Sequence, residues 1–513
     1  MLSRENRLDL LTGGHDFCSS VGLFWTRFEE ENPGLVQKLK DEKGDLECCL
    51  PLAVYGDEGQ SHKKAQFLIF ATQPTLGFGT SFTQEKDGHA SDLGVNMMGV
   101  SCLTRFVYSV MKASLYNRTP DVFMSLLTQF SNHVEELYRD GIRIWHSKYG
   151  RHIVIYPTVL FVKGDWPWLK KAGNLVRTHH QAVAHPGRGR GICHLCLAGT
   201  PDHADWSDVN GSWLCESPLQ TDQAPWVRES PLLKLCQFSG TPAKALWFRP
   251  DLFHTLHKGV LSELAGSALV VLLDHNFDGF SGDIPSRLAE LHSELRTWCR
   301  GHQVPLHMSG LSRTILHFEK SADFPTGGWF KGADTSAVCR FLEAKLKEVL
   351  LRSDSLHEYI GSILAAVTGG NAFLRALYNA NLFLGKAEAG LVASHGRQLL
   401  EGYMKAASLS YSLGYTRFKL IPKVHMLAHF VLLMEEASRT RTWCLSPLSY
   451  SCQMDEDLVG RCSAMSRTSS IRTVHQRTLR KYLVNVKFHL QQEPRECKKA
   501  LRAEPSKRQK LTR

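Results

Sequence analysis

The chain has 513 residues, of which 43% are apolar and 22% charged, a composition typical of a globular protein with a large core and two to four domains. Residues 1–12 lack the pattern of a secretion signal, and no uninterrupted apolar run is long enough to cross a bilayer, so we expect neither secretion nor a membrane partner. The net charge of +11 is uneven, because residues 461–513 carry fifteen Lys and Arg against three Glu. This basic end predicts an anionic partner, first of all nucleic acid, although its last twenty residues fit a solvated tail equally well.

The first third of the chain predicts helices followed by strands. Residues 1–45 look helical, and we interpret them as an N-terminal remnant of a longer region. Two short apolar runs, residues 50–56 and 66–72, are joined by a polar turn and predict a β-hairpin. A helix is expected at about residues 120–138, and the strongest strand pattern covers residues 152–162.

An aspartate follows each of the two strongest strand patterns. Asp57 comes directly after the run 50–56, and Asp165 lies just beyond the run 152–162. Carboxylates on separate rigid elements are hard oxygen ligands suited to two divalent ions roughly 4 Å apart, as phosphoryl transfer requires. Either aspartate alone is more often an ordinary turn residue, so only the pair supports this hypothesis.

A close cysteine pair lies in the irregular region 178–230, which is rich in His, Gly, Asp, Pro and Trp. Cys193 and Cys196 have the C-x-x-C spacing of half a tetrahedral zinc site, and the βαβ setting of a redox pair is absent. We therefore predict structural zinc rather than chance core cysteines. The candidates to complete the site are His179, His180, His185, His203 and Cys215, with His185 and His203 as our choice.

Helical patterns dominate from about residue 250 to residue 430. The clearest units are residues 256–273, 286–299, 335–352 (with Asp334 as N-cap), 357–384 and 387–411. The first third holds too few strands for a finished sheet. An α/β platform interrupted by a helical insertion therefore fits the order of elements better than three independent domains.

Three further clusters carry chemistry. Asp251 and His254 share a helix face, where they could form a hydrogen bond, help bind a metal, or serve as an N-cap beside an incidental histidine. His425 and His429 are four residues apart, but without the Glu of H-E-x-x-H they suggest packing histidines rather than a zinc protease. The acids 455–457 fit either the first turn of a helix or one inward carboxylate that binds a metal.

Taken in chain order, these segments resemble the catalytic region of eukaryotic transposases of the CACTA, Plavaka and Kyakuja–Dileera–Zisupton group. In that resemblance Asp57 matches the first acid of a D-D-E/D triad, and Asp165 matches the second within an Asp-x-Pro segment. The other similar segments are Gly191-Ile-Cys193-His-Leu-Cys196, Asp251-Leu-Phe-His254 with Gly259-Val260, Pro422-Lys-Val-His425-Met-Leu-Ala-His429, and Trp443 with the acids 455–457 and Gly460.

The resemblance implies an α/β fold class: an RNase H-like catalytic core with a small zinc-knuckle region and a large all-α insertion. The expected parts are an N-terminal remnant (1–45), the first part of the core (46–177), the Cys/His knuckle (178–250), the insertion (251–439), the last part of the core (440–490) and a basic tail (491–513). The implied reaction is DNA phosphodiester cleavage and strand transfer with Mg²⁺ or Mn²⁺, in which Asp57, Asp165 and Glu456 are the catalytic acids. The alternative is a catalytically inactive or domesticated protein of transposase origin that binds DNA or another partner.

The basic end is expected to contact DNA and to direct the protein to the nucleus. A helix there would pack on one side and present cations to phosphates on the other. The candidate contacts are Arg467, Arg472, Arg477, Arg480 and Lys481. Beyond them, Lys498-Lys499 and Lys507-Arg-Gln-Lys510 resemble the two halves of a nuclear-import signal. A homo-oligomer is compatible with this reading.

Overall fold

The computed structural model describes residues 1–61, 65–86, 92–179, 191–201, 203, 205–209, 223–352, 356–470 and 472–508. The chain divides into two compact units. The first contains Met1–Asn174, Arg228–Arg249 and Cys452–Arg513, and the second contains Leu175–Val227 and Pro250–Ser451. The first unit is therefore assembled from three separate stretches of sequence.

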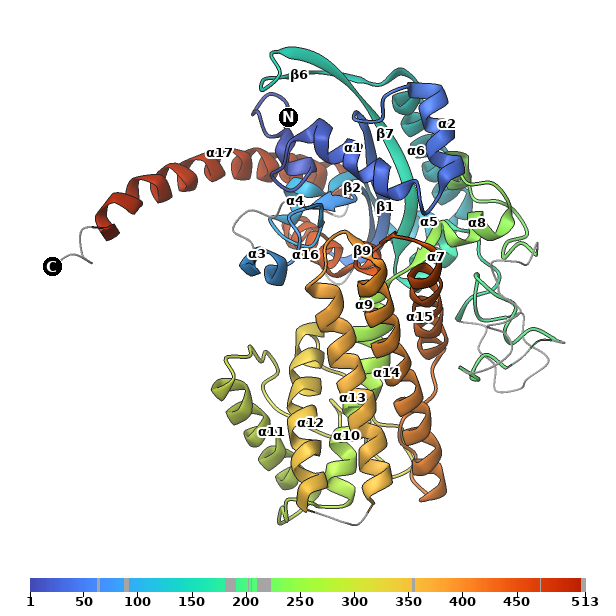
Figure 1. Cartoon of the computed structure of the whole chain (residues 1–513), viewed down its shortest axis with the longest axis vertical. Coiled ribbons are helices and arrows are strands. Elements are labelled where there is room, and N and C mark those ends of the chain that lie inside the picture. Colours follow the sequence, from blue (N-terminus) through green and yellow to red (C-terminus); the bar gives the residue numbers. More distant parts are fainter. Residues whose placement is uncertain are drawn as a thin grey trace. The chain divides into compact units, whose positions relative to one another are not determined.

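A six-stranded mixed sheet is the framework of the first unit (Figure 1). Its strand order is β5-β2-β1-β7-β6, and β8 also pairs with β7. β1 runs antiparallel to β2 and parallel to β7, while β2 runs antiparallel to β5. The strands are β1 (Cys49–Gln60), β2 (Gln66–Pro74), β5 (Phe106–Lys112), β6 (Ile142–His146), β7 (Arg151–Gly164) and β8 (Phe248–Pro250).

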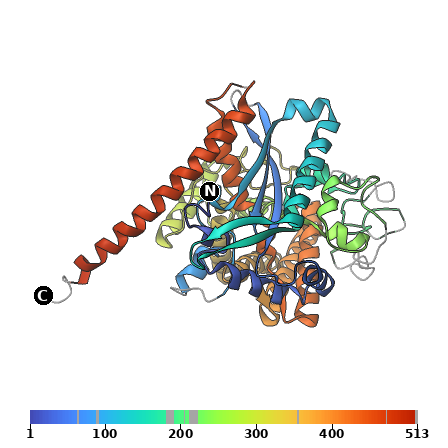
Figure 2. The ribbon, with the colours of Figure 1, turned by 90° about the horizontal axis from the view of Figure 1, so that it is seen from above.

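Helices cover both faces of this sheet because its inner strands are apolar on both sides. On one face, Tyr55 and Ile69 belong to a core cluster that includes Tyr482 of α17. On the other face, the ring of Phe70 lies 4.5 Å from that of Phe130 in α6 and 5.4 Å from that of Trp168 in α7. In Figure 2 the strands accordingly lie between α17 and α6. The helices are α1 (Phe17–Phe28), α2 (Pro33–Lys43), α4 (Ser101–Thr104), α5 (Ala113–Arg118), α6 (Pro120–Asp140), α7 (Trp166–Ala172), α8 (Thr241–Leu246), α16 (Gln453–Ser466) and α17 (Val474–Arg508).

The second unit is largely helical, with α13 packed against α12 and α14, and α14 against α15. Two helical stretches, Leu252–Asp274 and His357–Tyr378, are long and apolar enough to cross a bilayer by length and composition alone. The most apolar parts of these stretches are 89% and 61% buried inside the structure, as is usual for core helices. The main elements are α9 (Leu252–Thr255), α10 (Leu261–Asp274), α11 (Ile284–Gly301), α12 (Gly332–Arg352), α13 (His357–Tyr378), β9 (Phe383–Gly385), α14 (Lys386–Ser412), α15 (Pro422–Thr440) and β10 (Trp443–Leu445).

The chain is a mixed α/β protein with many helices, but several details differ from the expectations. Residues 1–45 pack as part of the first unit, where the indole of Trp25 donates a hydrogen bond of 2.7 Å to the carbonyl of Cys49. Residues 228–249, expected in the knuckle, also belong to that unit. The helix expected over 357–384 ends at Tyr378, since Phe383–Gly385 pairs with β10 as a strand. Asp334 lies inside α12 rather than at its N-cap, and it accepts hydrogen bonds from His307.

Candidate functional site

Two neighbouring parallel strands position Asp57 and Asp165. β1 and β7 pair through Gly56↔Gly164, and each aspartate is the residue that follows this last parallel pair. The expectation that Asp165 lies just beyond a strand is confirmed, because β7 ends at Gly164. One detail is corrected: β1 continues to Gln60, so Asp57 lies within its strand rather than at the end.

The two glycines leave room for the ring of Trp168. A Cβ atom on Gly56 would lie 2.4 Å from Cη2 of that ring, and one on Gly164 would lie 2.0 Å from its Cδ1. The indole therefore covers this face of both strands. Because side chains alternate along a strand, Asp57 points to the opposite face with Tyr55, toward α16.

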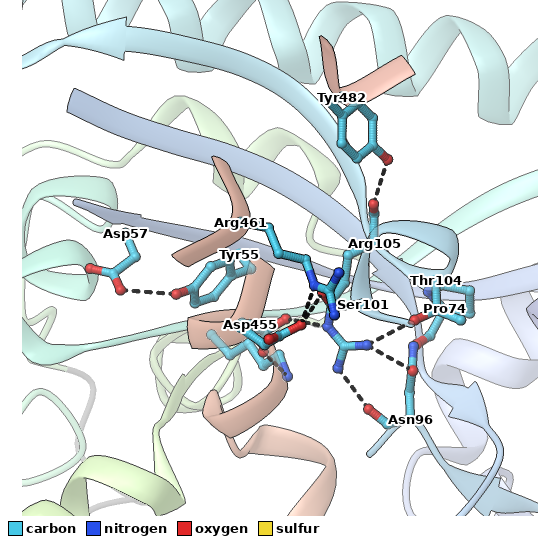
Figure 3. A network of polar contacts seen from close by, with 12 residues as sticks. Tyr55, Asp57, Pro74, Asn96, Ser101, Thr104, Arg105, Asp455, Arg461 and Tyr482 are labelled. Carbon is cyan, nitrogen blue, oxygen red and sulfur yellow. Dashed lines mark hydrogen bonds and ion pairs between the residues drawn. The ribbon is translucent and has the colours of Figure 1, made fainter. Parts of the chain in front are cut away.

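The carboxylate of Asp57 is held by hydrogen bonds from its own strand (Figure 3). The hydroxyl of Tyr55 donates to Oδ2 at 3.0 Å, and the backbone N–H of Glu58 donates to Oδ1 at 2.6 Å. Burial raises the pKa of Tyr55 well above its ordinary value, and the charges of Asp57 and Glu456 raise it further. The phenol therefore stays protonated at neutral pH and remains a donor to Asp57.

Asp165 has a structural task as well. It is the N-cap of α7, and its Oδ1 accepts a hydrogen bond of 2.8 Å from the backbone N–H of Trp168. Pro167 follows in the first turn, where its missing N–H costs no helical hydrogen bond. The Asp-Trp-Pro segment thus fixes the turn from strand β7 into α7.

Asp455 anchors α16 through a fully buried ion network (Figure 3). Its carboxylate lies 2.9 Å from Nε of Arg105 and 2.8 Å from Nζ of Lys163. Arg105 also donates to the side chain and the carbonyl of Asn96, and the hydroxyl of Tyr482 donates to the Arg105 carbonyl at 2.6 Å. Sequence reasoning missed both cations. The one available signal was a lysine directly after the apolar run of β7.

The other two acids of the cluster 455–457 have different surroundings. Asp457 lies on the exposed side of α16, where it accepts a hydrogen bond from Ser101 and pairs with Arg461 at 2.7 Å. Glu456 is half-buried, and its charge acts on Tyr55 second only to that of Asp57. Asp57 on β1 thus contacts this phenol, and the charge of Glu456 on α16 also raises its pKa.

A buried group of two cysteines and two histidines lies in the second unit. Cys193 and Cys196 meet His425 and His429 of α15, and all four candidate ligand atoms lie within 4.8 Å of one another. Sγ of Cys193 is 3.5 Å from Nε2 of His429, Sγ of Cys196 is 3.2 Å from Nε2 of His425, and the two Nε2 atoms are 3.1 Å apart. Tetrahedral zinc would separate sulfur from nitrogen by roughly 3.6 Å and the two nitrogens by roughly 3.4 Å. The group therefore fits a zinc ion.

Neighbouring groups hold these side chains in place and shift the pKa values of the two thiols. Nδ1 of His425 lies 3.2 Å from the carbonyl of Trp206, which orients Nε2 toward the cysteines. Arg177 donates to the carbonyl of Cys193 at 3.2 Å. Burial raises the pKa of Cys196 well above its ordinary value. Burial also acts to raise the pKa of Cys193, but hydrogen bonding with Cys196 and the nearby imidazoles lower it well below.

The structure corrects one of the two histidines chosen for this site, His203. His203 is exposed, and its Nδ1 lies near Thr200 and Pro201, apart from the group. His179 is also outside the group, while His180, His185 and Cys215 lie outside the described residues. In the structure His425 and His429 complete the group, although their sequence pattern favours packing histidines. The sequence marks this histidine pair but not its link to the cysteines, because 229 residues separate Cys196 from His425.

Asp251 and His254 form the start of one helix. Asp251 accepts hydrogen bonds of 2.9 Å from the backbone N–H groups of Phe253 and His254, and its Oδ2 lies 2.5 Å from Nδ1 of His254. The N-cap and the hydrogen-bonded pair are thus both present. Gly259 stands at a kink, where a Cβ atom would lie 2.4 Å from the Lys423 side chain. In this structure the D-x-x-H segment shapes a helix.

The predicted DNA-contacting helix, α17, has one buried and one exposed side. Lys481 belongs to neither: its ammonium donates to the carbonyl of Met465 at 2.9 Å and to Thr468 and Ser469, which holds the end of α16. Side chains at every fourth position are buried, namely Val474, Thr478, Tyr482, Val486 and Leu490. The exposed predicted cations are Arg467, Arg472, Arg477 and Arg480. The side chains of the proposed import signal, Lys498 to Lys510, lie outside the described part of the chain.

Comparison with known proteins assigns no family: no protein-family model matches the sequence, and neither does any curated protein. Within the described part of the chain, the Cys₂His₂ group is the cluster of ligating side chains close enough to hold a metal. Asp57, Asp165 and Glu456 are not part of it.

Proposed function

We propose that the first unit is the catalytic core of a transposase-like enzyme, which cleaves DNA phosphodiester bonds with Mg²⁺ or Mn²⁺ and joins the freed 3′ end to target DNA. One observation carries this proposal: the parallel pairing of β1 and β7 places Asp57 and Asp165 directly after the same residue pair, Gly56↔Gly164. Glu456 lies on α16, which packs on β1. An RNase H-like core interrupted in sequence by a helical unit is the architecture that the resemblance implies, and the three-part first unit supports it.

The residues of this core would share the work as follows. Asp57, Asp165 and Glu456 offer hard carboxylate oxygens on two strands and a helix, the donor type that Mg²⁺ and Mn²⁺ prefer. Bound divalent ions would activate a water or 3′-hydroxyl and stabilise charge on the leaving oxygen. Tyr55 orients Asp57 through the hydrogen bond to Oδ2. Asp455 keeps α16 fixed on the sheet, so that Glu456 stays on the side of Asp57.

The Cys₂His₂ group would hold structural zinc. Four protein ligands complete a tetrahedron, and all four are buried, whereas a catalytic zinc keeps one position for water or substrate. The group links residues 193–196 to α15, so the bound ion would hold the irregular region 191–209 on the helical unit.

A second candidate is a catalytically inactive, DNA-binding descendant of such an enzyme. It is favoured by the protein hydrogen bonds that the two aspartates already accept, Asp57 from Tyr55 and Glu58, and Asp165 from the N-terminus of α7. Each carboxylate has about four acceptor positions, so these bonds leave room for a metal ion but do not require one. An activity measurement separates the two candidates.

The test is nicking and linearisation of supercoiled DNA by the full chain with Mn²⁺, with Mg²⁺, or with EDTA. We expect metal-dependent cleavage that falls to background in Asp57→Asn, Asp165→Asn and Glu456→Gln. Two neighbouring acids are matched controls: Glu58, which bonds to Tyr116, and Asp457, which pairs with Arg461. Glu58→Gln and Asp457→Asn should keep the activity. Cleavage that survives all three acid substitutions would contradict the assignment, and DNA binding without any cleavage would favour the inactive descendant.

A further inference from the structure

The hairpin of β6 and β7 carries a basic segment that contains no acid. Residues 143–152, Arg-Ile-Trp-His-Ser-Lys-Tyr-Gly-Arg-His, contain three Lys or Arg, two His and no acid. β6 is an edge strand, and it pairs with the first part of β7 from Ile142↔Ile155 to His146↔Arg151. A two-stranded ribbon thus presents these cations at one side of the sheet.

The two faces of the hairpin differ. Ile153, Ile155 and His146 are buried on one face. On the other face, Arg143 and Trp145 alternate along β6, and His152 lies opposite Trp145. All three are exposed, and Trp145 is 49% exposed. Its ring meets that of His152 edge-on at 5.2 Å. We call Arg143, Trp145 and His152 the ribbon face.

The ribbon face continues into a further row of aromatic rings and a cation. Alternation along β7 places Tyr156 on the same face as His152. The ammonium of Lys43 lies 4.4 Å from the ring centres of both Tyr156 and Tyr138. Lys43 and these two rings form a second cation–ring group, which also includes Glu42 because its carboxylate accepts a hydrogen bond from Tyr138.

Two of the hairpin cations are uncompensated. Lys148 in the turn pairs with Asp16 at 2.7 Å, so its charge is already balanced. The side chains of Arg143 on the ribbon face and of Arg151, which lies opposite His146 on the other face, form no hydrogen bond or ion pair with any residue that the structure describes. Their guanidinium groups are exposed and available to an anionic partner.

We propose that the ribbon face binds DNA whose bases are unpaired, an inference that rests on the proposed function for DNA as the substrate. Arginines alone would attract the phosphates of any DNA. A half-exposed indole gains nothing from phosphates, but it stacks on the face of a base, and that face is open only where the strand is unpaired. The occupant that uses both chemistries is a single strand, such as an end freed by cleavage.

The test compares the affinity of the full chain for a labelled oligothymidine of about 20 nucleotides with its affinity for a closed hairpin duplex. Trp145→Ala should weaken binding of oligothymidine roughly 5- to 100-fold and leave duplex affinity unchanged, because stacking on one base is lost. Trp145→Phe keeps a flat ring and should stay near wild type. Tyr411→Ala is the matched control, since Tyr411 of α14 is 85% exposed.

The arginine of the ribbon face is tested in the same assay. Arg143→Gln should weaken both ligands and flatten the salt dependence of oligothymidine binding by up to about 0.7 units of slope, the value for one phosphate contact. Arg296→Gln removes the same charge from an exposed side of α11 and should change little.

Three results would overturn the proposal. The first is that Trp145→Ala binds oligothymidine with unchanged affinity. The second is that Trp145→Ala loses equal affinity for duplex and for oligothymidine and also has a lowered melting temperature. The third is that Trp145→Ala changes the sedimentation of the protein but not its DNA affinity, since the ribbon face would then bind another copy of the chain. Asp57→Asn keeps the two proposals apart: it should stop cleavage but leave oligothymidine binding intact. Cleavage lost in Asp57→Asn, with binding unaffected by Trp145→Ala, would refute the ribbon and leave the proposed function standing.

Discussion

Gly56 and Gly164 face each other across β1 and β7, and together they leave the space that the ring of Trp168 occupies. Asp57 and Asp165 are the next residues after these two glycines. The packing of the indole therefore fixes the backbone directly before both carboxylates. We predict that Gly56→Ala destabilises the first unit by about 1–3 kcal/mol, because the new methyl group would overlap the ring. Urea unfolding followed by circular dichroism measures this change.

A double-mutant cycle checks the cause. In a Trp168→Leu background the smaller side chain leaves room for the methyl group, so the cost of Gly56→Ala should shrink. Gly460→Ala is the control, because Gly460 lies in α16 with nothing within 4 Å of an added Cβ atom. That change should be neutral or stabilise α16 by up to about 1 kcal/mol. If Gly56→Ala costs as much in the Trp168→Leu background as in the wild type, the overlap is not the cause.

The buried network of Asp455 makes a second prediction. Asp455→Asn removes the charge that balances Arg105 and Lys163, both of which are almost fully buried. Leaving two buried cations without their partner should cost about 3–5 kcal/mol of unfolding free energy. Asp457→Asn breaks a largely exposed pair with Arg461 and should cost less than about 1 kcal/mol. Equal costs in the two variants, measured by urea unfolding, would contradict the anchoring role of Asp455.

The metal group gives a third prediction, which elemental analysis decides. The purified chain should contain one zinc per molecule, and Cys193→Ser or His429→Ala should lose it. His203→Ala should keep it, because His203 is exposed and outside the group. Binding requires deprotonated thiols and neutral imidazoles, so zinc should be released as the pH falls. Zinc retained in His429→Ala, or lost in His203→Ala, would contradict the assignment.

The contrast between these sites shows which site residues local sequence patterns can predict. Asp57 and Asp165 were found because each follows a run of apolar residues, and such a run predicts a strand and its end. Cys193 and Cys196 were found because their spacing is local. The partners of the cysteines and of Asp455 come from far along the chain: His425 lies 229 residues from Cys196, and Arg105 lies 350 residues from Asp455. The spacing of His425 and His429 marks them as a pair, but nothing in the local sequence links them to the cysteines or links Arg105 to Asp455.

A different limit applies to charged groups inside the core. Lys163 ends an apolar strand, and sequence reasoning places such a lysine at the surface because burial of an unpaired charge is costly. Only the fold shows that Asp455 approaches it. The same holds for Lys481, which a basic helix pattern assigns to phosphate binding, while the structure shows it holding the end of α16.

His257 makes stability depend on pH. It is buried near the kink of the helix that begins at Asp251, and burial lowers its pKa from 6.5 to about 4. Its Nδ1 has no hydrogen-bond partner among the described residues. Between pH 6.5 and pH 4 the unfolded chain binds a proton that the folded chain does not, so stability falls as the pH falls. The loss from pH 7 to pH 5 should be roughly 2 kcal/mol.

The variant His257→Leu tests this cause. Leucine fills similar space and does not titrate, so the drop in urea-unfolding free energy between pH 7 and pH 5 should shrink by most of that amount. His475→Leu on the exposed side of α17 is the control and should keep the drop. An identical pH dependence in wild type and His257→Leu would rule out this histidine as the source.

The exposed side of α17 provides the last prediction, which separates two roles of neighbouring cations. Arg477 and Arg480 are exposed, whereas the ammonium of Lys481 is bound to the end of α16. If α17 contacts phosphates, Arg477→Gln with Arg480→Gln should weaken duplex binding and flatten its salt dependence by nearly two units, about 0.9 for each contact. Lys481→Gln should instead lower the unfolding free energy and leave the salt slope unchanged. Fluorescence anisotropy at several salt concentrations, together with urea unfolding, measures both effects. A salt slope that responds to Lys481→Gln but not to the arginine variant would reverse this assignment.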